Sequence, residues 1–290
     1  MIDLKDVTKL YGDVTAVKSL DLHVQEGEIM GIIGHNGAGK TTTLKMIVGL
    51  VSPTSGEIRV MGRDIAEQGT YVKQFVGFLP EQSSLYEKMT VTEYLFFFAE
   101  LYGVPRRVAQ RRMDELLGSL DLSERDQRTG ELSKGMRRKV AIARTLLHDP
   151  RVLVLDEPNA GLDPLTSFFI IDYLKGLKES GRTLLVSAHN LFHMEYICDR
   201  VAILRNGELV VCDTMEAIQE RLGRREYEVI FRSDRELDFP KEDGNYVVRA
   251  SDVGAVASVL ERISDNDWAL VNLSVRESAL EEIYVRLMSQ

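Results

Sequence analysis

Eight consecutive residues have the types and spacing needed to hold phosphate groups. They match the pattern G-x-x-x-x-G-K-[ST] and are Gly34, His35, Asn36, Gly37, Ala38, Gly39, Lys40 and Thr41. Glycines let backbone N–H groups close around phosphate oxygens at the start of a helix, and Lys40 adds a positive charge there. The Thr41 hydroxyl suits Mg²⁺, and Thr42 follows it beside the phosphates. A plain glycine turn between a strand and a helix would leave the lysine and the threonine unexplained.

Two adjacent carboxylates end an apolar stretch later in the chain. Asp156 and Glu157 follow Val152-Leu153-Val154-Leu155 with no polar residue before them. A carboxylate at the edge of an apolar sheet needs a cation or hydrogen bonds to stay charged. Near a phosphate-binding loop, that cation is most simply the Mg²⁺ of a nucleotide, directed by Asp156 through a water, while Glu157 holds the attacking water. Many buried strands end in acidic turns, so the pair gains its meaning from the loop at 34–41.

Strands and helices alternate around these two motifs, as expected for βαβ units in a largely parallel sheet. Asn206-Gly207 is a hairpin signal after the last of these strands. The strands predicted after an N-terminal strand region (2–24) are 28–33, 57–61, 75–79, 152–155, 183–187 and 201–204. The predicted helices are one after residue 39, several within 90–148 with breaks around 103–105 and 122–130, and two at 164–180 and 190–198.

The composition changes near Gly223, where we place a domain boundary. Beyond it, short strands at 227–231, 246–250 and 268–275 and helices at 253–263 and 278–288 predict a small α/β appendage.

Charge and composition narrow the possible partners. The 290 residues carry a formal net charge of -9, which opposes a broad attraction to nucleic acid. Three local basic clusters, at 106–107, 111–112 and 137–139, are interleaved with other residues at helical spacing, so we expect solvated helix faces. Only Cys198 and Cys212 are present, which argues against a disulfide framework. The apolar stretch at 91–104 is interrupted by glutamates and too short to span a bilayer, so any transport must occur in a partner.

Further motifs make the chain resemble an ABC ATPase over roughly residues 1–220. Leu132-Ser133-Lys134-Gly135-Met136 resembles the family signature LSGGQ, and Gln82 lies where the family has its Q-loop glutamine. The segment 159–163, ending at Asp163, resembles the D-loop, and His189 the switch histidine. Tyr11 matches the aromatic residue that stacks on adenine.

The resemblance implies a fold class: α/β, with a phosphate-loop (RecA-like) ABC ATPase core, an antiparallel β subdomain and a helical insert, plus a small C-terminal α/β domain. We therefore expect an ATPase domain at 1–222, with its helical subdomain at about 83–148, and an accessory domain at 223–290. The implied ligands are ATP and Mg²⁺, with Thr41, Gln82 and Asp156 as metal ligands and Glu157, His189 and Gln82 as catalytic residues.

The signature also implies pairing, because the family closes its site between two subunits arranged head to tail. Ser133 and Gly135 would then face the partner's γ-phosphate, in a homodimer or with a related ATPase subunit. Lys134 and Met136 depart from the family's glycine and glutamine. With the ending RESALEEIYVRL, this variant is similar to ATPase subunits of ABC-2 type exporters.

Two of these residues have simpler interpretations. A histidine such as His189 is more often structural at the end of a strand, and Tyr11 could be a half-buried strand residue. The other histidines, His23, His35, His148 and His193, have no comparable context.

The predicted function is an ATP-hydrolysing subunit bound to an integral membrane permease, cytoplasmic at the inner face of the cell membrane, without nucleic acid. We expect the permease to dock beside Gln82, where Leu85, Tyr86 and Phe96-Phe97-Phe98 exceed what one amphipathic helix needs for its own core. One alternative is a soluble ABC-type ATPase regulating translation or DNA repair, which would usually show two cassettes or a coiled-coil insert. Another is a GTPase or small-molecule kinase, for which no Asn-Lys-x-Asp motif occurs.

Overall fold

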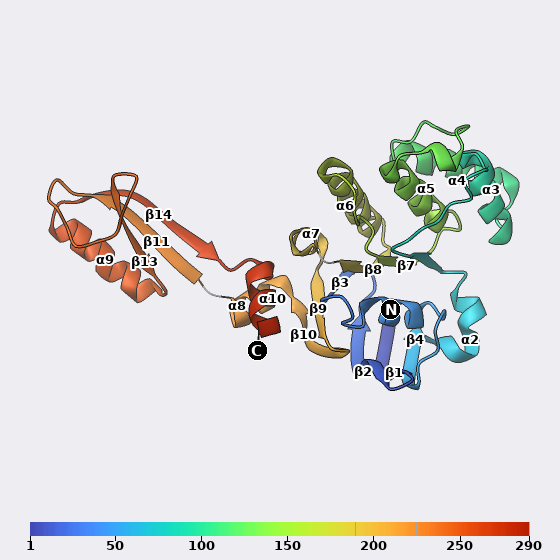
Figure 1. The fold of residues 1–290 in the computed structure, drawn as a ribbon, viewed down its shortest axis with the longest axis horizontal. Coiled ribbons are helices and arrows are strands. Elements are labelled where there is room, and N and C mark those ends of the chain that lie inside the picture. The colour runs from blue at the N-terminus through green and yellow to red at the C-terminus, as the bar shows by residue number, and fades with distance from the viewer. Residues whose placement is uncertain (189, 224, 290) are drawn as a thin grey trace. The chain divides into compact units, whose positions relative to one another are not determined.

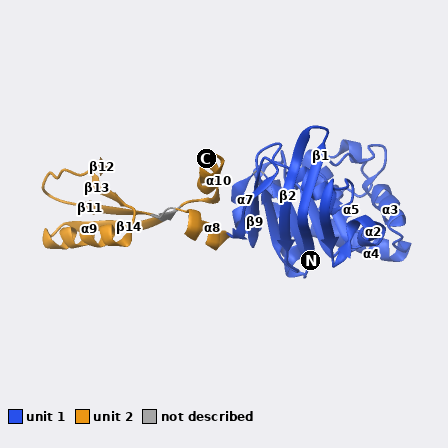
Figure 2. Ribbon diagram, turned by 90° about the horizontal axis from the view of Figure 1, so that it is seen from below, with its two compact units in different colours: residues 1–214 blue, residues 215–290 orange. Residues whose placement is uncertain are grey.

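The computed structural model describes residues 1–188, 190–223 and 225–289, which form two compact units, Met1–Thr214 and Met215–Gln290 (Figure 2). His189, predicted as the switch histidine, lies outside the described residues.

A six-stranded sheet forms the centre of the first unit. Its order is β10-β9-β3-β8-β7-β6, and only β10 runs antiparallel to its neighbour. All residues of β3, β7 and β8 are buried, as is usual for parallel strands covered on both faces. The strands are β3 (Ile29–Ile33), β6 (Val76–Leu79), β7 (Val152–Asp156), β8 (Thr183–Ala188), β9 (Arg200–Arg205) and β10 (Glu208–Thr214).

A second, antiparallel sheet of order β2-β1-β4-β5 packs on the first through a shared apolar core. This core contains Ile2 and Leu20 from the antiparallel sheet, Met30 and Val154 from the six-stranded sheet, and Leu44 from the helix that follows β3. The elements are β1 (Ile2–Tyr11), β2 (Val14–Val24), β4 (Ser55–Val60) and β5 (Arg63–Asp64), with α1 (Lys40–Ile47) and α2 (Ile65–Val72). Neither β5 nor α2 was predicted.

Helices α3, α4 and α5 gather on the side of the six-stranded sheet away from the antiparallel one (Figure 1). A capping box starts the first, since Thr90 accepts the Glu93 N–H and the Glu93 carboxylate accepts the Thr90 N–H. The helices are α3 (Val91–Leu101), α4 (Arg106–Ser119), the 3₁₀ turn η1 (Thr129–Glu131), α5 (Lys134–Leu146), α6 (Pro164–Glu179) and α7 (Leu191–Ile197). The two predicted breaks between 90 and 148 both occur.

The second unit is a four-stranded antiparallel sheet, of order β12-β13-β11-β14, with α9 packed on it around Phe231. Its elements are α8 (Met215–Leu222), β11 (Arg225–Arg232), β12 (Lys241–Glu242), β13 (Asn245–Ala250), α9 (Val253–Asp265), β14 (Ala269–Glu277) and α10 (Leu280–Ser289). The unit begins earlier than the boundary expected near Gly223, because α8 packs against α10 and Arg286 donates to the Leu222 carbonyl at 2.8 Å. No helix in the described part of the chain is long and apolar enough to cross a membrane.

Candidate active site

The glycine-rich loop joins β3 to α1 and has room only for glycine at two of its positions. A Cβ on Gly34 would lie 2.7 Å from the Leu204 carbonyl oxygen, and one on Gly39 would lie 2.6 Å from the Ala16 oxygen. Gly39 also has φ 103°, a backbone conformation that side chains disfavour. Packing against β9 and β2 therefore sets the shape of the loop.

Lys40 lies inside this loop. Its side chain is buried, and Nζ donates to the carbonyls of Gly34 at 2.6 Å and His35 at 3.3 Å. Within the described residues, no side chain caps the start of α1, and its first turn holds no acidic residue. The first N–H groups of a helix carry partial positive charge, so this end of α1 with Lys40 suits an anion. Thr41 and Thr42 are part-buried in the same turn.

Asp156 is the last residue of β7 and Glu157 follows it, at the same edge of the sheet, with β8 between β7 and β3. Asp156 is 1% exposed, and Ser187 on the intervening β8 donates from Oγ to Asp156 Oδ1 at 2.5 Å. Glu157 has φ 47°, which is unusual for a residue with a side chain. Its N–H donates to the carbonyl and the hydroxyl of Ser187, both at 3.1 Å. The carboxyl ends of β3, β8 and β7 thus bring the loop and the carboxylates to one edge.

The signature residues begin helix α5. Ser133 is its N-cap and accepts the Met136 N–H at 3.3 Å, while its own side chain stays exposed. A Cβ on Gly135 would lie 3.1 Å from Thr166 Cγ2, so the signature packs closely on the start of α6. The Lys134 ammonium occupies the place where a Cβ of Gly161 would be. The signature therefore contacts the D-loop segment of its own chain.

Gln82 is exposed and lies with these residues around one cavity of about 420 Å³. The cavity is lined by Glu81, Gln82, Ser83, Lys134, Arg137, Arg138, Ala160, Gly161 and Leu162. Segments predicted as Q-loop, signature and D-loop thus meet in space.

Two polar contacts hold the D-loop segment. Asp163 is the N-cap of α6 and accepts the Thr166 N–H at 2.9 Å, a hydrogen bond that lowers the Asp163 pKa. Asn159 Nδ2 lies 2.6 Å from Nδ1 of His193, and burial lowers the pKa of His193, which favours the neutral ring that can accept this bond. Sequence reasoning missed His193, because nothing local to α7 indicates a contact with residue 159.

Tyr11 ends β1 and is 48% exposed, which fits a half-buried strand residue and leaves part of its ring accessible. The Lys9 ammonium lies 5.0 Å from the centre of its ring.

The prediction that the basic cluster at 137–139 is solvated is wrong for Arg138. That side chain is buried at 8% exposure, because its guanidinium turns inward to backbone carbonyls near Glu157. Periodicity alone did not distinguish it from the exposed Arg137.

Comparisons with known proteins identify the family of the chain. The ABC transporter family model matches residues 17–160. ABC transporter ATP-binding protein NatA of Bacillus subtilis (strain 168) is 38% identical over 239 residues, covering 80% of this chain and 97% of that protein. The chain belongs to the ABC transporter ATP-binding family. Two further relatives of this ABC subunit are named for resistance or export.

Linearmycin resistance ATP-binding protein LnrL of the same strain is 37% identical over 224 residues, 77% of this chain and 72% of that protein. Nod factor export ATP-binding protein I of Burkholderia orbicola (strain AU 1054) is 38% identical over 220 residues, 76% of this chain and 72% of that protein.

Solved structures give the same fold. An ATP-binding subunit of an ABC transporter covers 76% of this chain and 92% of its own, with 32% identity and a TM-score of 0.70. A dimeric ATP-binding cassette in a post-hydrolysis state, bound to ADP and Pi, covers 74% and 99%, with 29% identity and a TM-score of 0.68. The predicted fold class is confirmed, and the ABC subunit is an ATPase that binds ATP.

Proposed function

We propose that this chain binds ATP with Mg²⁺ in its first unit and hydrolyses it to power a separate integral membrane permease, as the energy-coupling subunit of an ABC-2 type exporter. The observation that carries this proposal is the meeting of the phosphate loop and of Asp156–Glu157 at one edge of the six-stranded sheet. The exporter assignment draws on the relatives named for linearmycin resistance and Nod factor export.

The residues of the proposed site have different roles. Lys40 and the N–H groups of α1 hold the β- and γ-phosphates, which buries negative charge against fixed positive groups. Glu157 holds the attacking water and takes its proton, and His189 contacts the γ-phosphate. Tyr11 stacks on the adenine ring with its exposed face.

Mg²⁺ fits the donor set. Within the described residues, no cluster of three or more His, Cys, Asp or Glu side chains could hold a metal ion by itself. Thr41, Gln82 and Asp156 supply a hydroxyl, an amide and a carboxylate oxygen, and Mg²⁺ is usually held by few protein oxygens together with phosphates. When bound, the ion neutralises charge on the phosphates.

The working unit is a pair of subunits, either two copies of this chain or one copy with a related ATPase. Ser133 is exposed at the start of α5, so this helix end is open to another molecule's phosphate. In this arrangement, Ser133 and Gly135 complete the partner's site and Asp163 lies at the contact. The dimeric cassette with ADP and Pi supports such pairing.

The permease docks on the aromatic surface beside Gln82. Leu85 is buried, whereas Tyr86 is 51% exposed and stacks on Phe98 with ring centres 6.1 Å apart. Phe96, Phe97 and Phe98 are each part-buried, so the alternative of three fully buried rings does not apply.

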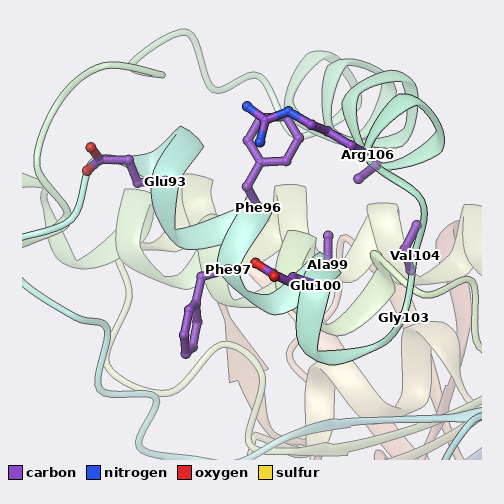
Figure 3. Close-up of a pocket in the computed structure, with 9 residues that line it drawn as sticks. Glu93, Phe96, Phe97, Ala99, Glu100, Gly103, Val104 and Arg106 are labelled. Atoms are coloured by element: carbon purple, nitrogen blue, oxygen red, sulfur yellow. The ribbon is translucent and has the colours of Figure 1, made fainter.

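A hollow of about 630 Å³ lies beside these rings, between α3 and the start of α4 (Figure 3). Phe96 lies against the Arg106 guanidinium at 4.7 Å, and Phe97 points to the other side of α3. An apolar floor with charged edges suits a short amphipathic helix. This docking would hold the subunit at the cytoplasmic face of the cell membrane.

Affinity capture from detergent-solubilised membranes tests the proposal. Tagged protein should retain one integral membrane protein in stoichiometric amount. Tyr86→Glu should lose it while keeping ATPase activity, because a charge placed on the aromatic surface is desolvated on docking. Leu50→Glu, at a residue 59% exposed outside the helical segment, is the matched control and should capture normally. If Tyr86→Glu captures the membrane protein normally, the docking surface lies elsewhere. If the wild type captures no membrane protein, the proposal of a permease partner is wrong.

A further inference from the structure

The buried guanidinium of Arg138 ties two stretches of the chain, 80–83 and 156–158, to its own helix. It lies on α5, one turn after Lys134, and its side chain reaches the ends of β6 and β7. Six oxygens accept hydrogen bonds from it. Nε donates to Pro158 O at 2.6 Å, and Nη2 donates to Asp156 O and Glu157 O at 3.1 and 2.6 Å. Nη1 donates to Pro80 O, Glu81 O and Ser83 Oγ at 2.9, 3.0 and 3.4 Å.

The chemistry of these contacts requires arginine. A guanidinium presents its N–H donors in a flat fork, so it can hold groups on several sides at once, whereas an ammonium is a single point. Burial lowers the pKa of Arg138 to about 10, so the group keeps its charge at neutral pH. Burying a charge among neutral carbonyls is costly, and a plain packing residue would not require it.

One of the acceptors belongs to a strained residue. Glu157 has φ 47°, in the left-handed region that side chains disfavour. Its N–H is fixed by Ser187 and its carbonyl by Arg138. The direction of the Glu157 side chain depends on this backbone conformation, and strain of this kind persists only where surrounding contacts enforce it.

Two other acceptors lie directly before Gln82. Pro80 and Glu81 contribute their carbonyls, so the backbone leading to Gln82 is tied to the same guanidinium. The helix that carries Arg138 also begins at Ser133. A single side chain therefore links the signature helix, the segment before Gln82 and the end of β7.

We propose that Arg138 is a positioning residue for ATP hydrolysis, which keeps the Glu157 backbone and the Gln82 segment in register with the signature helix. The proposal rests on the roles proposed above for Glu157 and Gln82. Arg138 acts through these residues and does not touch the nucleotide.

Steady-state ATPase kinetics with purified full-length protein test this role. For Arg138→Lys we expect kcat to fall by roughly tenfold, and for Arg138→Met by roughly a hundredfold, with KM for ATP changed by less than about twofold, because the nucleotide contacts remain. Arg111→Met, at an exposed arginine on α4, is the matched control and should keep both values. Should Arg138→Met not fold by thermal melt, Arg138→Lys carries the test.

A double mutant separates positioning from general stability. In a Glu157→Gln background, Arg138→Lys should add little further loss to the single-turnover rate, since both changes act on the same step. Fully additive losses, normal kcat in Arg138→Lys, or equal rises in KM would overturn the positioning role. If Glu157→Gln is inactive and Arg138→Lys is normal, only the positioning role of Arg138 fails. Normal turnover in Glu157→Gln would overturn both the proposed role of Glu157 and the positioning role of Arg138.

Discussion

Two helices of the first unit, α1 and α5, begin at positions suited to phosphate, and the two positions differ in how far this chain encloses them. The start of α1 is enclosed: Lys40 is buried against the Gly34 and His35 carbonyls, and β2 and β9 pack on the loop. The start of α5 is open, with Ser133 and Lys134 exposed to solvent. One chain therefore encloses the proposed phosphate site around α1 but forms only an open surface at α5, where in our proposal another molecule brings the phosphate.

The largest effect is expected at the enclosed site, from Glu157→Gln. The amide keeps the shape of the side chain and loses the charge that orients water, so we expect kcat to fall by roughly 100-fold or more, about 3 kcal/mol of barrier, with ATP still bound. Phosphate release measures hydrolysis and a fluorescent ATP analogue measures binding, so together they separate a loss of hydrolysis from a loss of binding.

Lys40→Ala provides the contrast, because it removes a charge that holds the phosphates. We expect weaker ATP affinity in this variant, measured with the same analogue. Unchanged affinity would count against the loop as the phosphate site.

The difference between these two regions also explains what the sequence could reveal. The phosphate loop is contiguous, so eight neighbouring residues display its glycines, lysine and threonine together. Asp156 and Glu157 are adjacent too, and the alternation of strands and helices predicts that they reach the same sheet edge. Most strands and helices of the first unit follow from that same local pattern.

The sequence pattern could not predict contacts between residues that are far apart in the chain. Arg138 bonds to residues 18 to 58 positions away in the chain, so its neighbours 137 and 139 give no sign of its burial. His193 contacts Asn159 from 34 positions away. Helix α8 was missed because the composition changes only after it, although packing against α10 makes it part of the second unit.

The open helix start should show its effect in pairing. With ATP and Mg²⁺, we expect Glu157→Gln to form a dimer, because slow hydrolysis cannot reset the composite site. Light scattering at increasing protein concentration measures this, and a monomer under saturating ATP would contradict pairing of the isolated subunit.

Adding Lys134→Glu to that variant should weaken the dimer by about tenfold while ATP binding to the single chain persists, since the reversed charge would face the partner's phosphate. Lys88→Glu makes the same charge change at an exposed lysine outside the signature and serves as the control. Equal effects of the two lysine variants would mean that net charge, rather than the start of α5, governs pairing.

The smallest expected effect concerns the contact that joins the D-loop segment to α7. His193 accepts the Asn159 amide N–H only when its ring is neutral, and burial lowers its pKa below the ordinary 6.5. A group whose pKa is lower in the folded state than in the unfolded state contributes its full stabilisation at pH values above the unfolded pKa. That stabilisation is lost as the pH falls through the folded pKa. ATPase activity should therefore hold through pH 6.5 and decline by a few-fold, about 1 kcal/mol of barrier, only at more acidic pH.

His193→Gln supplies a carbonyl that can accept the same N–H without titrating, so its pH profile should stay flat in that range. An identical acid decline in both proteins would assign the titration to another group and leave the Asn159 contact without influence on hydrolysis.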